Sequence, residues 1–236
     1  VVNWIKWDLR GGDLSPSCRN ALLSQGLTLD KKIEYHILGN HLFTNAKALV
    51  FIGCYFDGID SNRLLDKGLK FILRELDRQV LNDGGNFELS PMYHCTFLED
   101  VLDLLNILRT CRPQGCESVL DVLKTVIPKM LVWMNHMTHG DGRVSCFNDS
   151  ATNIASSPTD IVEYAKRLGF RASESQFVQS VRYDFLSDSG YVSITRGDLK
   201  MILDVANLGP DHLLAHAHAD SLTFELSLAT QRLIVN

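Results

Sequence analysis

The 236-residue sequence has no long apolar run, no paired-cysteine motif and no excess of basic residues. No segment reaches the roughly 18 consecutive apolar residues that a membrane-spanning helix needs. None of the six cysteines stands in a C-x-x-C motif, so neither a zinc knuckle nor a thioredoxin-like redox site is indicated. The net charge of −5 argues against a nucleic-acid-binding protein, which usually carries a basic excess. We therefore expect no membrane span and no nucleic-acid partner.

The sequence does not begin with methionine, and its opening residues do not predict a signal peptide. It opens with Val1-Val2-Asn3-Trp4, which is typical of the interior of a protein, and its last predicted strand ends abruptly at Asn236. We therefore expect an internal fragment of a longer protein. The opening gives no indication of the compartment.

The composition itself is that of an ordinary globular protein, with 45% hydrophobic and 22% charged residues. Up to about residue 170, apolar residues recur at three-to-four spacing, which predicts helices. Beyond that point an alternating pattern predicts strands, with a hairpin turn at Gly197-Asp198. The predicted helices include 42–56, 60–76, 91–108, 117–137 and 159–168, and the predicted strands are 190–196, 199–205, 222–228 and 231–235.

Helices followed by strands indicate two domains of an α+β protein rather than an alternating α/β sheet. We predict a helical domain of antiparallel pairs over residues 1–170 and the start of an antiparallel β domain over residues 171–236. Four short strands make a poor free-standing sheet, so we expect further strands in the natural protein.

The segment His216-Ala217-His218-Ala219-Asp220 directly precedes a predicted strand. In an extended chain the two histidines and the aspartate point to one side, with only alanines between them. Such a cluster suits a metal ion, proton transfer, or both. Zinc hydrolases with an H-x-H-x-D motif usually need further histidines, and none follows Asp220 here. The alternative is that both histidines are structural groups at a domain junction.

A second cluster, Gly39-Asn40-His41, stands at the start of a predicted helix. The N–H donors of a helix start favour negative charge, so the site suits a carboxylate. The alternative is that Asn40 is only a helix cap, a role for which asparagine is well suited.

A third cluster lies within residues 83–94, where a glycine-rich turn and Pro91 precede Tyr93 and His94. Because proline restricts the start of the helix, the two titratable rings are presented on a rigid support. From the residues alone, an ordinary half-buried tyrosine with a bonded hydroxyl is an equal interpretation of Tyr93.

Together these clusters resemble a known family. The pieces YHILGNHLFTNAKALVFIG, DGGNFELSPMYH and HAHADSLTFELS occur in this order, and the resemblance runs from about Trp4 to the last residue. They are similar to the heparinase II/III-like polysaccharide lyases and their alginate-lyase relatives. The resemblance implies an incomplete α/α toroid followed by an antiparallel β-sandwich, which matches the order of elements predicted above.

The resemblance also implies β-elimination on a uronic-acid-containing polysaccharide. Asn40 and His41 would then neutralise the uronate carboxylate and so stabilise an enolate-like state. Tyr93 would be a general acid/base on the leaving-group side, and His216 the second proton-transfer group, acting as the base for one substrate epimer.

Three further residues are candidates for contact with the substrate: Glu88, His94 and Asp149. Glu88 would orient Tyr93 or His94, although a solvated glutamate is an equal interpretation. Asp149 lies in a predicted loop and would line the cleft, or else cap the following helix.

In several members of the family a zinc ion lies near the β-strand motif, and the resemblance carries one ligand over to His218. The next ligand position falls near Asn236, where a neutral amide is a weaker ligand than a carboxylate. We therefore predict at most one zinc ion, with a structural role, and no other cofactor.

Two alternatives from other functional classes remain. One is a metal-dependent hydrolase that uses His216, His218 and Asp220, and the other is a non-catalytic glycan-binding protein on the same scaffold. The predicted partner is an anionic polysaccharide or oligosaccharide, and the resemblance implies a periplasmic or secreted protein. The polymer, the epimer preference, endo or exo action and the oligomeric state are left open.

Overall fold

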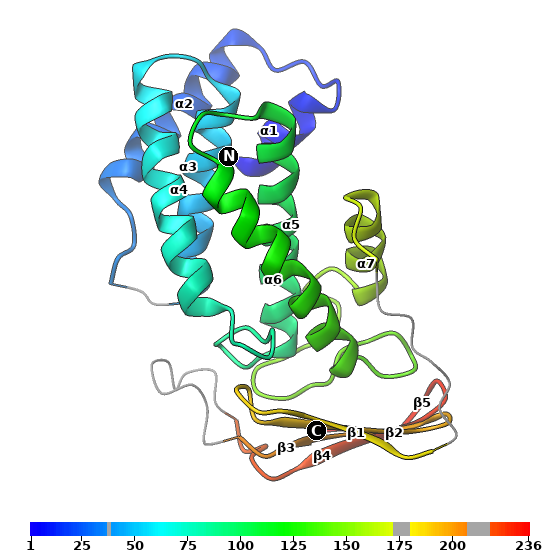
Figure 1. Ribbon diagram of the computed structural model, residues 1–236. Helices are drawn as coiled ribbons and strands as arrows, with labels where there is room; N and C mark the ends of the chain where they lie inside the picture. The colour runs from blue at the N-terminus through cyan, green and yellow to red at the C-terminus, as the bar shows by residue number, and fades with distance from the viewer. Residues whose placement is uncertain (37–38, 172–179, 207–217) are drawn as a thin grey trace. The chain divides into compact units, whose positions relative to one another are not determined.

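The computed structural model describes residues 1–36, 39–171, 180–206 and 218–236, and it has the predicted order of helices followed by strands (Figure 1). The helices of this part of the chain are α1 (Val2–Leu9), α2 (Pro16–Lys31), α3 (Asn40–Tyr55), α4 (Ile59–Gln79), α5 (Pro91–Cys111), α6 (Glu117–His136) and α7 (Pro158–Arg167). The strands are β1 (Arg182–Leu186), β2 (Tyr191–Arg196), β3 (Leu199–Asp204), β4 (Phe224–Leu228) and β5 (Gln231–Ile234). The predicted α+β class is therefore confirmed.

Local sequence signals explain where two of the helices begin. The side chain of Ser15 accepts a hydrogen bond from the backbone N–H of Cys18, and Pro16 opens α2. Ser157 and Pro158 repeat this arrangement at the start of α7. A serine cap satisfies an otherwise unpaired N–H group, and proline fits the first helical position because it needs no donor there.

The described chain forms two compact units, and three long helices each contribute to both. Val1–Asp77 with Asp103–Leu123 make up the first, which we call the helical unit. Arg78–Leu102 with Lys124–Asn236 make up the second, which we call the sheet unit. The predicted division at residue 170 stays a prediction. No helix of the described residues is long and apolar enough to cross a membrane.

The helical unit is built around α3, most of whose residues are buried. A buried charge cluster accompanies this apolar core: the Asp103 carboxylate lies 2.6 Å from the Lys47 ammonium and 2.8 Å from that of Lys6. These two ammonium groups lower the pKa of Asp103 against the opposing effect of burial. Because each buried charge has an oppositely charged partner, the cluster is compatible with the apolar core around it.

The sheet unit contains one antiparallel sheet with the strand order β1-β2-β3-β4-β5. The hairpin predicted at Gly197-Asp198 joins β2 to β3, with Arg196 paired to Leu199. The sequence prediction missed β1, so its count of four strands was wrong. In β1 the aromatic side chains Tyr183 and Phe185 are 74% and 59% exposed, so this edge strand has no buried apolar periodicity.

The two faces of the sheet are used in an unexpected way. In β4 the polar residues Glu225 and Ser227 are buried, whereas Phe224 and Leu228 are exposed. The exposed positions continue the apolar face of Tyr183 and Phe185 across the sheet. In a β-sandwich, an apolar face of this kind packs against a second sheet.

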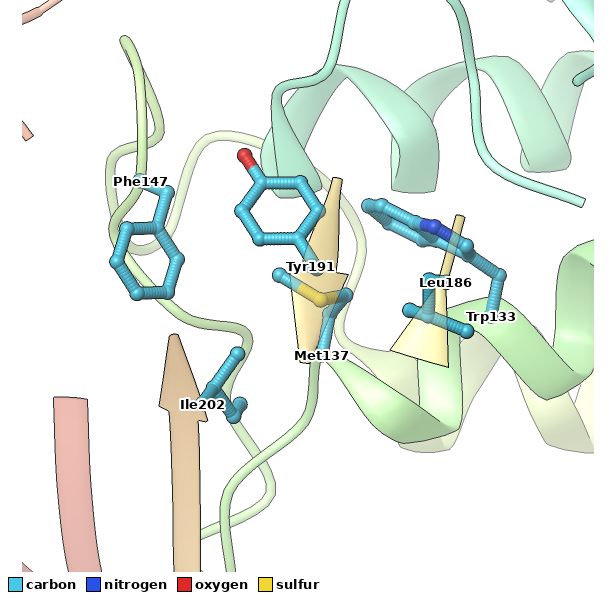
Figure 2. Close-up of a cluster of buried hydrophobic side chains, with 6 residues drawn as sticks. All are labelled: Trp133, Met137, Phe147, Leu186, Tyr191 and Ile202. Atoms are coloured by element: carbon cyan, nitrogen blue, oxygen red, sulfur yellow. The ribbon is translucent and has the colours of Figure 1, made fainter. Parts of the chain in front are cut away.

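The opposite face packs on the end of α6 through six buried side chains (Figure 2). They are Trp133, Met137, Phe147, Leu186, Tyr191 and Ile202. The indole N–H of Trp133 donates to Ser189 Oγ at 2.9 Å, so its one polar atom is satisfied inside this cluster. Gly85 is needed beside this ring, because a Cβ there would lie 2.7 Å from the indole nitrogen.

Candidate functional site

Tyr93 lies in the first turn of α5, and the segment before it is fastened to a second loop. The hydroxyl of Ser150 accepts a hydrogen bond from the backbone N–H of Met92 at 3.0 Å. The same hydroxyl lies 3.0 Å from Ser90 Oγ. The start of α5 is therefore held by Ser150, which stands 60 positions after Ser90 in the chain. This agrees with the predicted rigid support for Tyr93.

Two carboxylates lie close to Tyr93. Its pKa is raised, first by burial and then by the negative charges of Asp149 and Glu88. The Tyr93 side chain is half-buried, and Glu88 is almost fully buried. A tyrosine hydroxyl is protonated at neutral pH, so it is able to donate a proton. The structure thus brings together three of the predicted site residues, Glu88, Tyr93 and Asp149.

The loop that carries Asp149 is held in place by Asn148, which the sequence prediction did not single out. The Asn148 side-chain amide donates to the Leu89 carbonyl at 3.0 Å and to the Tyr191 hydroxyl at 2.9 Å. Its backbone N–H donates to the carboxylate of Asp220. The signal available in the sequence was an Asn-Asp pair in a loop, which is typical of turns and says nothing about distant partners.

The histidine motif is only partly described. His216 lies outside the described residues. His218 is exposed, and Asp220 is 2% exposed with its carboxylate accepting the Asn148 N–H. The predicted extended alternation was wrong for residues 219–222, which form turns. The reason is local, because the Asp220 carbonyl accepts both the backbone N–H and the hydroxyl of Thr223.

The donors available for a metal ion do not form a ligand set in the described residues. No group of three histidine, cysteine, aspartate or glutamate side chains in this part of the chain is arranged to hold an ion. The Asn236 amide oxygen accepts from Thr223 Oγ1 at 3.4 Å, and its backbone N–H donates to Glu225. The proposed zinc ligands His218 and Asn236 thus stay predictions of the family resemblance, and we derive no step through a metal.

Asn40 and His41 belong to the helical unit, at the predicted start of α3. Gly39 occupies the cap position with φ of 99°, and Asn40 is the first helical residue, so the interpretation of Asn40 as the cap was wrong. A φ of this sign is readily adopted by glycine, which has no Cβ. His41 is exposed, and its Nδ1 lies 3.5 Å from Glu34 Oε2.

Glu34 is a partner of His41 that the sequence prediction missed. Its pKa is lowered, first by a hydrogen bond from Asn45 and also by His41. The Asn45 amide donates to Glu34 Oε2 at 3.0 Å and to the His41 carbonyl at 2.7 Å. Asn45 thus links the Glu34 carboxylate to the backbone of His41.

His94 is fully buried, and both of its ring nitrogens have partners within the sheet unit. Nδ1 accepts from the backbone N–H of Asn86 at 3.2 Å, so Nε2 carries the proton and donates to the Met130 carbonyl at 3.0 Å. The ring also lies 4.3 Å from the Trp133 ring, centre to centre. These contacts give His94 a structural role, and its contact with substrate stays a prediction.

We expect His94 to make the protein acid-sensitive. Burial lowers its pKa to about 3, whereas a histidine in the unfolded chain has a pKa of about 6.5. Between these values the unfolded chain binds a proton that the folded chain does not, so stability is lost as pH falls, by up to about 1.4 kcal/mol per pH unit. Urea unfolding from pH 7 to pH 4 should show a smaller loss of stability in His94→Gln than in the unsubstituted protein. Equal losses would contradict this assignment.

Two family models match the sequence in succession. The model described as "Heparinase II/III N-terminus" matches residues 20–174, and the model described as "Heparinase II/III-like, C-terminal" matches residues 179–236. Together they cover most of both predicted domains and leave residues 1–19 unmatched.

Individual relatives are similar over only part of their length. A heparin-sulfate lyase of Bacteroides stercoris is 32% identical over 145 residues, which cover 58% of this chain and 21% of that protein. The FtsZ-localized protein C of Caulobacter vibrioides is 27% identical over 81% of this chain and 31% of its own. The crystal structure of a mutant heparan sulfate lyase from Pedobacter heparinus superposes with a TM-score of 0.68 at 22% identity, over 89% of this chain and 34% of its own.

The chain therefore spans between about a fifth and a third of the length of these proteins, from 21% to 34%. The structural likeness confirms the fold, a helical toroid segment followed by an antiparallel sheet. Since one family model alone covers residues 20–174, more than half of the sequence, the chain belongs to the heparinase II/III family.

Proposed function

We propose that the protein of which this chain is part is a polysaccharide lyase that cleaves a uronic-acid-containing anionic glycan by β-elimination. The observation that carries this proposal is the environment of Tyr93. Its hydroxyl belongs to a half-buried ring on a firmly held helix start, and two carboxylates favour its protonated form. A hydroxyl of this kind suits the protonation of a leaving glycosidic oxygen.

The reaction has three requirements. The uronate carboxylate needs its charge neutralised, because removal of the neighbouring C5 proton places further negative charge on it. A base must take that proton while the C4–O bond breaks and a C4=C5 double bond forms. An acid must then protonate the departing oxygen.

We assign these tasks to four residues. Asn40 and His41 neutralise the carboxylate. Tyr93 protonates the leaving oxygen, and His216 is the base for one substrate epimer. Since the names of two relatives refer to heparin or heparan sulfate, we propose a glycosaminoglycan as the substrate. A polymer of this kind lies outside cells, so we place the protein in the periplasm or outside the cell.

The test is direct, because elimination leaves a conjugated double bond that absorbs ultraviolet light and hydrolysis does not. The full-length protein should release such a product from heparan sulfate, or from another member of a panel of uronate polymers. A chelator should leave the rate unchanged as long as the protein stays folded.

Two other outcomes would overturn the proposal. New reducing ends without ultraviolet absorbance, lost on chelation, would indicate the metal-dependent hydrolase. Retention of the protein on a uronate polymer without any product, across the whole panel, would indicate a glycan-binding protein on the same scaffold.

A further inference from the structure

Asn148, which directly precedes Asp149, makes hydrogen bonds to several segments, although it has no role in the assignment above. It is 5% exposed and makes three hydrogen bonds to three separate parts of the sheet unit. Its side-chain amide reaches the Leu89 carbonyl and the Tyr191 hydroxyl, and its backbone N–H reaches the Asp220 carboxylate. The Tyr191 hydroxyl in turn donates to the Leu89 carbonyl at 2.7 Å, which closes a triangle of contacts. We call Asn148, Leu89, Tyr191 and Asp220 the Asn148 clamp.

The members of the clamp are themselves firmly held. The Tyr191 side chain is 0% exposed and packs against Phe147 and Trp133, with ring centres 5.5 Å and 6.0 Å away. Asp220 is 2% exposed. Buried hydrogen-bonded groups of this kind resist displacement, because breaking any one contact leaves a polar atom unsatisfied.

The clamp fixes a loop whose backbone is not in a relaxed conformation. Asn148 has a φ of 55°, a left-handed conformation that asparagine tolerates better than most residues with a side chain. On the other side of Asp149, the Ser150 hydroxyl holds the Met92 N–H and contacts Ser90. Asp149 thus stands between two anchored residues, both of which are attached to the segment just before Tyr93.

We propose that Asn148 is a positioning residue, which holds the loop of Asp149 beside the start of α5, where Tyr93 lies, through its contacts with Leu89, Tyr191 and Asp220. The Asp220 of the histidine motif then acts on the loop of Asp149 rather than on a metal ion. The consequence for catalysis rests on the proposed function, whereas the geometry of the clamp does not.

The electrostatic consequence is specific. Asp149 is the larger of the two charge effects that raise the pKa of Tyr93, after burial. If the clamp is opened, the carboxylate is no longer held near the hydroxyl and the pKa of Tyr93 should fall. A role of Asn148 in stability alone predicts no such change, so the ionisation of Tyr93 distinguishes the two.

The test uses Asn148→Gly in the full-length protein, since glycine adopts the left-handed conformation without strain and removes only the side-chain contacts. The matched control is Asn153→Gly, because Asn153 has a φ of 66° in the same loop region but an exposed side chain. Tyr191→Phe opens the clamp from its other side. Replacing Tyr93 by 3-fluorotyrosine allows its ionisation to be followed by ¹⁹F NMR without any need for activity.

We expect the ¹⁹F titration midpoint to fall by about half a pH unit or more in Asn148→Gly and Tyr191→Phe, a change of about threefold in the ionisation constant. With the natural tyrosine, kcat should fall by about 10²-fold with KM within about twofold, because the reacting groups are misplaced and not lost. Asn153→Gly should change neither quantity.

An unchanged ¹⁹F titration in both clamp variants would overturn the positioning role, even if their activity were lower. Absence of any lyase product from the unsubstituted protein would instead overturn the proposed function. In that case the titration alone would still decide whether Asn148 positions Asp149.

Discussion

The variant Tyr93→Phe is expected to lose at least about 10³-fold in kcat while it keeps the fold and the affinity for the polymer. General acid catalysis contributes about 10²–10⁴-fold, and the departing sugar alkoxide is a poor leaving group without a proton. The substitution removes only a hydroxyl from a half-buried ring, so the packing at the start of α5 is preserved. Production of the unsaturated uronate, followed by its ultraviolet absorbance, measures the effect.

A matched control separates the chemistry from the loss of a hydroxyl as such. Tyr164 is also half-buried, but it lies in α7 and packs beneath the Arg167 guanidinium, 5.6 Å from the ring centre. Tyr164→Phe should therefore retain the full rate. Near-normal turnover in Tyr93→Phe would show that another group protonates the leaving oxygen.

The leaving group offers a second and sharper test of the same role. An oligosaccharide analogue whose C4 substituent is a phenol departs without protonation, because a phenolate is a far weaker base than a sugar alkoxide. If Tyr93 is the acid, Tyr93→Phe should process this analogue at nearly the rate of the unsubstituted protein. If Tyr93 is instead the base that removes the C5 proton, the loss should be as large as with the natural polymer.

Five of the seven described helices and most of the strands were predicted, because their signals are local, whereas α1 and α2 were missed. The three-to-four spacing of apolar residues reports one face of a helix, and it found α3, α4, α5, α6 and α7. The Gly197-Asp198 turn fixed the hairpin of β2 and β3. These signals need only neighbouring residues, so a sequence contains all of the required information.

Burial on the sheet was harder to predict, because it depends on what lies against each face. In β4 the alternation was predicted correctly, but the polar side is the buried one. Glu225 and Ser227 face His139, which comes 86 and 88 positions earlier in the chain. Nothing near β4 in the sequence indicates this partner.

Prediction of the candidate site was limited in the same way, by contacts between residues that are distant in the sequence. The family resemblance indicated Tyr93, residue type and position indicated Glu88 and Asp149, and the structure brings these three together. Asn148 was missed because its meaning lies in contacts to Leu89 and Tyr191, which are 59 and 43 positions away. A turn-forming Asn is common in loops, and only the fold shows which ones hold a reacting group in place.

The largest expected effect on stability comes from Glu225, whose side chain is 0% exposed. One carboxylate oxygen lies 3.0 Å from His139 Nε2 and 3.1 Å from Arg232 Nη1, and the other accepts the Cys146 backbone N–H at 2.8 Å. Replacing Glu225 by alanine leaves these donors without an acceptor in a buried site. We expect Glu225→Ala to lower the free energy of unfolding by about 3–5 kcal/mol, because each donor left without an acceptor costs about 1–3 kcal/mol. Urea unfolding at neutral pH measures this loss.

The control for a lost glutamate is Glu163, which is 52% exposed and pairs with Lys166 at 2.7 Å on α7. An exposed pair of this kind contributes little because water and salt screen it, so Glu163→Ala should change the free energy of unfolding by no more than about 0.5 kcal/mol. Similar effects of the two substitutions would contradict the importance of the buried network.

Glutamine is the more informative replacement, because it keeps the shape of Glu225 but changes one acceptor into a donor. The partners of both carboxylate oxygens are donors: His139 and Arg232 at one, and the N–H groups of Cys146 and Asn236 at the other. His139 can adapt by changing its tautomer, but an arginine and a backbone N–H can only donate. Whichever way the amide turns, its NH2 group faces a donor, so Glu225→Gln should still cost about 1–3 kcal/mol.

Arg232 keeps Asp141 at 3.0 Å in both variants, so the difference between alanine and glutamine reports the unsatisfied donors rather than an unpaired arginine. A glutamine variant as stable as the unsubstituted protein would show that the site requires only the shape of the side chain and not an acceptor-only group.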